Sequence, residues 1–428
     1  MAKKNIIPEI MNHFYECKIF KVIHLQLYEK VEDNLYQAVK KGNEQKRIRA
    51  HLQPNIATNV STSELKELYQ QFLTDQRFEE SEENLNHPYF MRVENGIVDV
   101  REAKLIEDNK NVFLYCNSFK YVEDARWQQC PEFSKMLEKS GIIDVSKELL
   151  MEVLGYILSE CQGAKVAFFF IGPPDCGKSV LLNFISEIIG EDNVTAMPLN
   201  KLGARFNIAR LASARANICT ELSGGKMENV DIFKAITSNE KVTGEHKCEA
   251  AFEFTVTTKL LFAGNLLPKF PELEGAEALM NRMVILRFPK SVKEKDLDLS
   301  EKLLKERDII CSLAVKALKG LIARRLAFAE PEAAKSLKDE MRGEINLFQD
   351  FINENCEICS DGKVHFVTIW NAFQKFSEEN GCELSISKQQ FSQRIGMIEG
   401  VKHSRFRLNG SDPLRGYEGI RMKKKILC

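Results

Sequence analysis

Several features that define other protein classes are missing from this sequence of 428 residues. No apolar stretch approaches the roughly 20 residues of a membrane-spanning helix, so we expect no membrane partner. Net charge is nearly absent, with 60 Lys and Arg against 61 Asp and Glu, so any contact with nucleic acid must come from a local basic patch. The 12 cysteines follow no regular spacing, which argues against a disulfide scaffold and predicts a reduced, cytoplasmic protein.

A cysteine framework for zinc is missing as well. Cys356 and Cys359 form a lone C-x-x-C pair, whereas a zinc site of this type uses a second pair. His365 and Cys382 are the additional ligands within reach in the sequence, and a zinc site built from them is the weaker interpretation.

The chain does contain a glycine-rich segment that fits the pattern G-x-x-x-x-G-K-[ST] at every specified position. Its residues are Gly172, Pro173, Pro174, Asp175, Cys176, Gly177, Lys178 and Ser179. The apolar run 166–171 before it predicts a buried strand, and the apolar spacing over 180–189 predicts a helix. Strand, glycine loop and helix together are the context that a phosphate-binding loop requires.

The chemistry of such a loop follows from its geometry. Glycines allow successive backbone N–H groups to point inward, and the start of the following helix favours an anion at the same place. Lys178 is placed to reach the β- and γ-phosphates, and the hydroxyl of Ser179 is placed to bind Mg²⁺. The motif predicts ATP or GTP, and the lack of an N-K-x-D motif disfavours a GTPase.

Polar residues at three later strand ends are candidates to complete an ATP site. The apolar run 216–219 is followed by Thr220 and Glu221, and Glu221 is our candidate acid for orienting or deprotonating water and supporting Mg²⁺. Asn265 follows the apolar run 260–264 and is a candidate sensor of the γ-phosphate. Arg282 precedes a further strand and is a candidate arginine finger. A surface glutamate at a strand end is the alternative for Glu221.

Over residues 93–291 the sequence resembles the superfamily 3 helicases, which are ring-forming ATPases of the AAA+ type. The likeness is strongest to the phage and plasmid primase-helicase group, which includes the poxvirus primase-helicase. It rests on four segments besides the loop, which are 94–101 (Glu-Asn-Gly-Ile-Val-Asp-Val-Arg), 154–158, 250–265 and 280–288. Two departures are the Pro-Pro in the loop and a single acid at Glu221.

The resemblance implies roles for these residues. Asn265 becomes the sensor, and Arg282 acts on the nucleotide of a neighbouring subunit in a ring that is expected to be a homohexamer. It also implies a DNA-contacting hairpin over 241–248, with His246 and Lys247 at its tip, although a solvated turn lysine is an equal alternative for Lys247. The implied activity is 3′→5′ unwinding in the cytoplasm of a bacterial host, with ATP and Mg²⁺ as cofactors.

A primase domain would need clustered metal-binding acids, often as D-x-D, and residues 1–150 contain no D-x-D. We therefore expect a helicase without primase activity, and a separate primase or loader as a possible partner.

The carboxy-terminal residues predict a winged helix. Helical patterns over 366–380 and 387–395 precede a β-hairpin pattern over 401–421, and residues 401–428 carry eight Lys and Arg against two acids. The candidate contacts to duplex DNA at a replication origin are Lys388, Gln389, Arg394, Arg405 and Arg407. A basic tail on a protein-interaction domain is the alternative.

The predicted fold is an α/β P-loop AAA+ ATPase core with a helical N-terminal region and a C-terminal winged-helix domain. The expected units are a helical region over 1–90, an accessory domain over 91–160, the core over 161–292, a helical lid or linker over 293–355, and the winged helix over 356–428. Within them the apolar spacing over 25–41 predicts a helix, Ser61 and Glu64 predict a capping box, Asn95 and Gly96 predict the turn of a hairpin, and Gly244 suits a tight turn. The predicted function is an ATP-dependent replicative helicase of a mobile element. An origin-binding initiator without processive unwinding and a P-loop phosphotransferase are the alternatives.

Overall fold

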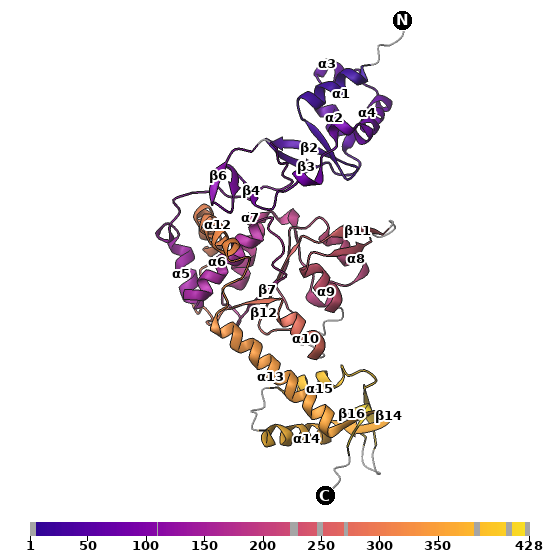
Figure 1. Ribbon diagram of the computed structural model, residues 1–428, viewed down its shortest axis with the longest axis vertical. Coiled ribbons are helices and arrows are strands. Elements are labelled where there is room, and N and C mark those ends of the chain that lie inside the picture. The colour runs from indigo at the N-terminus through magenta and orange to yellow at the C-terminus, as the bar shows by residue number, and fades with distance from the viewer. Residues whose placement is uncertain are drawn as a thin grey trace.

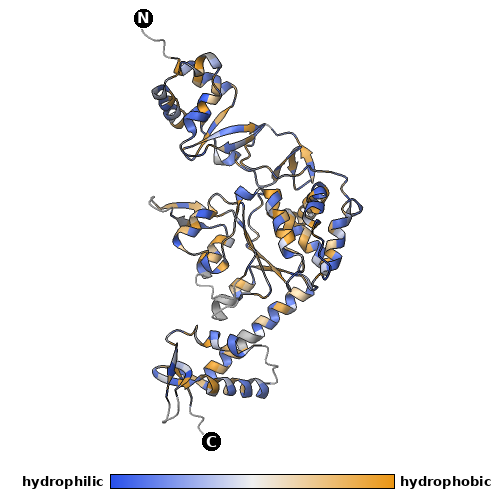
Figure 2. Ribbon diagram, turned by 180° about the vertical axis from the view of Figure 1, so that it is seen from behind, coloured by the Kyte–Doolittle hydropathy of each residue, from blue (hydrophilic) through white to orange (hydrophobic). Residues whose placement is uncertain are grey.

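The computed structural model describes residues 6–108, 110–222, 230–245, 251–268, 273–380, 386–407 and 413–423. The molecule is elongated, with an N-terminal unit at one end, a central α/β unit, and a C-terminal unit that the long helix α13 connects to the centre (Figure 1). Hydrophobic residues concentrate in the central unit, on the strands and on the helices that cover them (Figure 2).

The central unit is built on a parallel sheet of five strands in the order β13-β7-β12-β9-β8. The strands are β7 (Ala167–Ile171), β8 (Val194–Thr195), β9 (Ala216–Cys219), β12 (Lys259–Gly264) and β13 (Met283–Arg287). Strands β7, β9 and β12 are buried along their whole length, as is typical of parallel sheets with both faces covered. The sequence-based predictions of strands at 166–171, 216–219, 260–264 and before 288 are confirmed.

Alternate residues of the strands face two different hydrophobic cores. Phe168 and Phe170 of β7 belong to one core, and Phe169 and Ile171 belong to the other. This division follows from the two-residue period of a strand. Helices on the first face are α5 (Pro131–Ser140), α6 (Asp144–Leu158), α7 (Lys178–Ile189), α11 (Leu299–Lys305) and α12 (Arg307–Ala323). Helices on the second face are α9 (Val230–Thr237), α10 (Leu273–Met280) and the first part of α13 (Glu332–Asn355).

The first core runs continuously across the boundaries that the sequence suggested. It contains Val93 from the predicted accessory domain, Leu182 from the predicted ATPase core and Ala314 from the predicted lid or linker. Helices α6 and α12 pack against each other within this core. Residues 91–160 and 299–323 are therefore structural parts of the central unit, because they bury apolar side chains in this shared core.

The N-terminal unit is a mixed α/β structure rather than the expected helical region. Helices α1 (Ile7–Glu16), α2 (Glu44–Ala50), α3 (Pro54–Ala57) and α4 (Thr62–Thr74) surround an antiparallel sheet of β1 (Phe20–Ile23), β2 (Gln26–Glu32) and β3 (Leu35–Ala38). The helix expected over 25–41 is replaced by β2 and β3. Asn34 adopts a left-handed turn with φ 60°, and Leu27 and Glu29 alternate as buried residues, so the two-residue period determines the structure.

Two local predictions in the N-terminal half are confirmed. Ser61 accepts a hydrogen bond from the backbone of Glu64, whose side chain accepts one from Ser61 in return, so the capping box at the start of α4 is present. The hairpin predicted to turn at Asn95 and Gly96 is formed by β4 (Phe90–Val93) and β5 (Gly96–Asp99), and β6 (Lys104–Ile106) adds a third strand.

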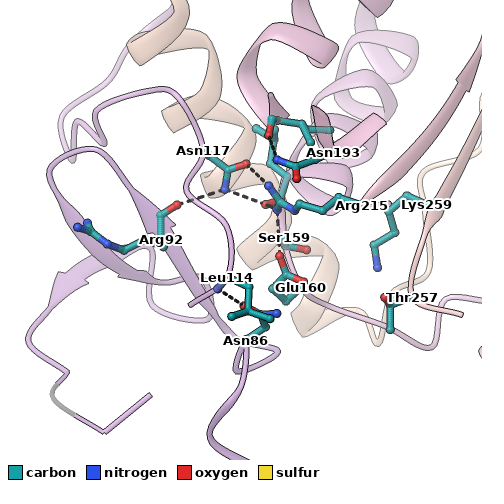
Figure 3. Close-up of polar contacts among 12 residues, drawn as sticks. Asn86, Arg92, Leu114, Asn117, Ser159, Glu160, Asn193, Arg215, Thr257 and Lys259 are labelled. Atoms are coloured by element: carbon teal, nitrogen blue, oxygen red, sulfur yellow. Dashed lines mark hydrogen bonds and ion pairs between the residues drawn. The ribbon is translucent and has the colours of Figure 1, made fainter. Parts of the chain in front are cut away.

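A buried polar cluster joins the 86–117 segment to the amino-terminal edge of the central sheet (Figure 3). The guanidinium of Arg215, just before β9, donates to Asn117 Oδ1 at 3.0 Å, to the Leu158 carbonyl at 2.9 Å and to Glu160 Oε1 at 3.0 Å. Leu158 is the last residue of α6, so the cation also satisfies a free carbonyl at that helix end.

The C-terminal unit contains a three-stranded antiparallel sheet in the order β14-β16-β15, together with two helices and the end of α13. Its elements are β14 (Cys356–His365), α14 (Phe366–Glu379), α15 (Lys388–Ile395), β15 (Lys402–Phe406) and β16 (Leu414–Met422). The two predicted helices and the predicted hairpin are confirmed, whereas β14 was not predicted. Phe348 and Phe351 of α13 belong to this core, so the unit begins before residue 356.

The remaining elements are α8 (Arg205–Ile208) and the antiparallel hairpin of β10 (Lys241–Gly244) and β11 (Phe252–Thr255). His246 and Lys247, the predicted DNA contacts at the hairpin tip, lie outside the described residues. Gly244 was expected to serve a tight turn, but it ends β10, where an added Cβ would lie 3.0 Å from Ala209 Cα. Among the described helices, none combines the length and the apolar character that crossing a membrane demands.

Candidate nucleotide site

A cavity of about 440 Å³ lies at the carboxyl-terminal edge of the parallel sheet. Ile171 at the end of β7 is level with Gly264 at the end of β12, and Phe262 is level with Cys219 at the end of β9. The residues that follow these strands therefore meet at one edge, which is where ligands bind in open α/β sheets. Residues 174–180 of the glycine loop line the cavity together with Thr220, Gly264 and Asn265.

The glycine loop, residues 172–179, leads from β7 into α7. Gly177 adopts φ +92° as the N-terminal cap of α7, a conformation that glycine tolerates without strain. It has no side chain to cap the first turn, so the free N–H groups and the helix dipole favour an anion there. A Cβ on Gly172 would lie 2.3 Å from the carbonyl oxygen of Phe288, so only glycine fits against the chain leaving β13.

Lys178 is folded back onto the loop. Its side-chain ammonium donates to the carbonyls of Gly172 and Pro173, both at 2.8 Å, and contacts Cys176 Sγ at 3.1 Å. The residue is only 9% exposed, so these loop carbonyls replace the water that the ammonium loses. Ser179 is exposed and lines the cavity.

The structure brings most of the predicted site residues together. The hydroxyls of Ser179 and Thr220 and the amide of Asn265 line the same cavity as the loop, and oxygen donors of this kind suit Mg²⁺. Glu221 follows Thr220 and is exposed, but it is not among the described residues that line the cavity. Beyond Glu221 the chain stays beside β12, since the Leu222 N–H donates to the Ala263 carbonyl at 2.8 Å.

Arg282 lies apart from the cavity of its own chain. It precedes β13, and its carbonyl accepts a hydrogen bond of 2.8 Å from Ala167 at the beginning of β7. Its guanidinium donates to the Ala278 carbonyl at 3.0 Å and to Ser238 Oγ at 3.4 Å. Arg282 therefore stands at the amino-terminal edge of the sheet, opposite the glycine loop.

Sequence reasoning missed the other wall of the cavity. It is formed by α5 and by the segment 290–300 after β13, which we call the strap. Lys295 of the strap forms an ion pair of 2.9 Å with Asp175 of the loop, and a hydrogen bond from Lys302 holds the pKa of Asp296 below its usual range. The strap carries several Lys, Asp and Glu residues, but they fit no recognised motif, so it could not be recognised from the sequence.

A second groove of about 770 Å³ lies in the C-terminal unit, between α15 and the strands β15 and β16. Lys388, Gln389 and Arg405, which were predicted to bind DNA, line it together with His403 and Arg415. Arg407 is exposed just after β15.

Arg394 lies away from this groove. It lines a different cavity, of about 420 Å³, with Gly172 and Asn265, and its guanidinium lies 5.9 Å from the ring of Phe348.

Comparison with known proteins gives two family matches and a shared fold. Residues 9–140 match the family described as "D5 N terminal like", and residues 170–282 match "Family of unknown function (DUF5906)". The apo structure of the NrS-1 C terminal region superimposes with a TM-score of 0.53 at 12% identity, covering 97% of this chain and 100% of that chain. The A form of the same region gives 0.49 at 12% identity, covering 95% and 98%.

The superposition with a TM-score of 0.53 identifies a shared fold over nearly the whole chain. The match over 9–140 to the D5 family fits the resemblance to the phage and plasmid primase-helicase group.

Proposed function

We propose that this protein is an ATP-dependent DNA helicase of the superfamily 3, AAA+ type that serves the replication of a phage, plasmid or other mobile element. The observation that carries the proposal is the convergence of the glycine loop, Thr220 and Asn265 on one cavity at the carboxyl-terminal edge of the sheet. The D5 family match and the fold shared with the NrS-1 C terminal region support a protein of this replication type.

In this proposal the loop is a P-loop that holds the triphosphate of ATP. The amides at the start of α7 bind phosphate oxygens, and Lys178 exchanges its contacts with the Gly172 and Pro173 carbonyls for the β- and γ-phosphates. Ser179 and Thr220 provide hydroxyls for Mg²⁺, which offsets the charge of the phosphates when bound. Asn265 donates to a phosphate oxygen or orients water, and Glu221 orients the water that attacks.

Arg282 supports a ring rather than a single active subunit. It lies at the opposite edge of the sheet from the loop of its own chain, so it acts on the nucleotide of a neighbouring protomer, as an arginine finger does in trans. A closed ring with heterologous contacts, expected to be a hexamer, places each loop beside such a finger.

Two further regions are proposed to contact DNA. One is the segment between β10 and β11, whose Lys247 is proposed to bind single-stranded DNA in the ring channel. The groove of the C-terminal unit, which we interpret as a winged helix, presents Lys388, Arg405 and Arg415 to the phosphates of duplex DNA. An origin-binding initiator without unwinding would use the same groove.

The test is ATP hydrolysis by the full chain with Mg²⁺, with and without single-stranded DNA, together with unwinding of a forked duplex. Lys178→Ala removes the cation that stabilises phosphoryl charge, so we expect turnover to fall by about 100-fold or more. Lys66→Ala is the matched control, because Lys66 is an exposed lysine of α4 in the N-terminal unit and does not line the cavity.

The other outcomes separate the alternatives. Turnover without any response to DNA would favour a phosphotransferase. DNA binding without separation of the forked duplex would favour an initiator.

A further inference from the structure

The strap is fixed to the tip of the glycine loop by three contacts. The Val292 N–H donates to the Asp175 carbonyl at 2.8 Å, Ser291 Oγ donates to the Pro174 carbonyl at 2.9 Å, and Lys295 pairs with the Asp175 carboxylate at 2.9 Å. Because all three contacts fall on two consecutive loop residues, the strap and the loop form one structural unit around the cavity.

The turn of the strap is also held from its far side. Asp296 accepts hydrogen bonds from Lys302 at 2.6 Å and from the Asp298 N–H at 3.1 Å, just before α11 begins at Leu299. Leu297 is the residue between Asp296 and Asp298 in this turn. Polar contacts of its neighbours therefore determine its position, and burial of its own side chain does not.

Leu297 is 92% exposed although it lines the cavity, whereas Leu25 and Leu266, which are also strongly exposed, are 74% and 70% exposed. Covering an exposed leucine with apolar surface is favourable, so a ligand that covers it binds more tightly. The same wall of the cavity carries other apolar side chains, namely Met136, Val292 and Leu299, and Val180 of α7 adds another to the lining.

The lining of the cavity thus combines two chemistries. The glycine loop and the start of α7 present Lys178, Ser179 and free amides to an anion, whereas the strap and α5 contribute apolar side chains among charged ones such as Lys135 and Glu294. A ligand that joins a polyanion to a flat ring with polar edges fits both kinds of lining.

We propose that the strap forms the nucleobase subsite of this cavity and that Leu297 covers the base of the bound nucleotide. This inference rests on the proposed nucleotide-binding function and deepens it. Lys295 is a positioning residue in this arrangement, because it holds the strap to the loop through Asp175. The triphosphate end of the ligand does not contact Leu297.

The test compares binding of ATP and of inorganic tripolyphosphate to the full chain by calorimetry in the presence of Mg²⁺. Leu297→Ser is expected to weaken ATP binding by about 5- to 10-fold, which corresponds to losing roughly 50 Å² of covered apolar surface, and to leave tripolyphosphate binding unchanged. Leu297→Met keeps an apolar side chain and is expected to bind ATP as the wild type does. Leu25→Ser, an exposed leucine in the N-terminal unit, is the matched control.

Each other outcome overturns the inference. An equal loss of affinity for both ligands would mean that Leu297 supports the structure of the loop. No loss of ATP affinity would mean that Leu297 does not contact the nucleotide. A wild-type protein that binds tripolyphosphate as tightly as ATP would have no base subsite. A wild-type protein that binds neither ligand would overturn the proposed function itself, which is a distinguishable result.

Discussion

At the scale of single residues, two buried cations begin the strands whose other ends face the nucleotide cavity. Arg215 immediately precedes β9 and is 7% exposed, and Lys259 is the first residue of β12 and is 6% exposed. Arg215 has a carboxylate partner in Glu160. The Lys259 ammonium instead donates to the Cys161 carbonyl and lies 4.2 Å from the centre of the Tyr156 ring.

Burial lowers the pKa of Lys259 to about 7. In the unfolded chain its pKa is near 10.4, so between these two values the unfolded state binds more protons than the folded state. The free energy of unfolding therefore rises with pH through this window, and the cost of burying the charged amine is fully present only below pH 7. We expect wild type to gain about 2 kcal/mol relative to Lys259→Met between pH 7 and pH 9.

Denaturant unfolding of both proteins at the two pH values measures this difference, because all other titrating groups are shared. Lys66→Met, which removes an exposed lysine of α4, is the matched control. A constant difference between wild type and Lys259→Met across the window would show that this lysine titrates as it does in water.

At the scale of elements, the contact between α6 and α12 depends on one glycine. A Cβ on Gly155 of α6 would lie 2.3 Å from the Ala314 carbonyl oxygen and 2.9 Å from Leu318 Cβ. Gly320 of α12 is also helical, but the nearest atom to its added Cβ would be the end of the Arg324 side chain at 3.6 Å. The two glycines have the same intrinsic cost in a helix and opposite surroundings.

Gly155→Ala is therefore expected to lower the free energy of unfolding by about 1–3 kcal/mol through overpacking. Gly320→Ala is expected to raise it by up to about 1 kcal/mol, because alanine is the better helix former. Denaturant unfolding of the two variants beside wild type provides the comparison. Equal stabilisation by both substitutions would mean that α6 and α12 are not in close contact at Gly155.

The elements also show which parts of the structure sequence could predict. Strands β7, β9 and β12 are uninterrupted apolar runs that end in polar residues, and the capping box at Ser61 is a purely local signal, so both were predictable. Strand β2 was not, because buried Glu29 depends on Arg47 and His51 from another part of the chain. Contacts of this kind have no signature in the sequence around the strand.

The candidate site also has parts that the sequence could predict and parts that it could not. The loop, Thr220 and Asn265 were predictable because each follows a buried strand, and parallel strands bring their ends together. The strap was missed because its contacts with Asp175 join residues more than 100 positions apart in the sequence. The separate position of Arg394 was also unpredictable, since it depends on how α15 packs beside α13 and the loop.

At the scale of the whole molecule, the two edges of the central sheet divide the proposed machinery. Met283 is level with Ala167 and Arg287 is level with Ile171, so Arg282 and the glycine loop are separated by the length of a five-residue strand. At about 3.3 Å per residue this separation is roughly 16 Å, which is too long for an arginine side chain to span within one chain. In the proposed mechanism, Arg282 therefore acts on the nucleotide of a second copy of the protein.

If Arg282 acts on the nucleotide of a neighbouring subunit, two different inactive variants can restore activity when they are mixed. Lys178→Ala removes the phosphate contact and Arg282→Ala removes the finger, so each variant alone is expected to have little ATP turnover. In a mixed ring, an interface is intact when the Arg282→Ala subunit supplies the loop and the Lys178→Ala subunit supplies the arginine. An equal mixture places about a quarter of interfaces in that arrangement, so turnover is expected to recover toward that fraction of wild type.

ATP hydrolysis is measured after mixing, with subunit exchange followed by native mass spectrometry. Mixed assemblies that form but stay inactive would mean that Arg282 acts within its own chain or has no part in hydrolysis.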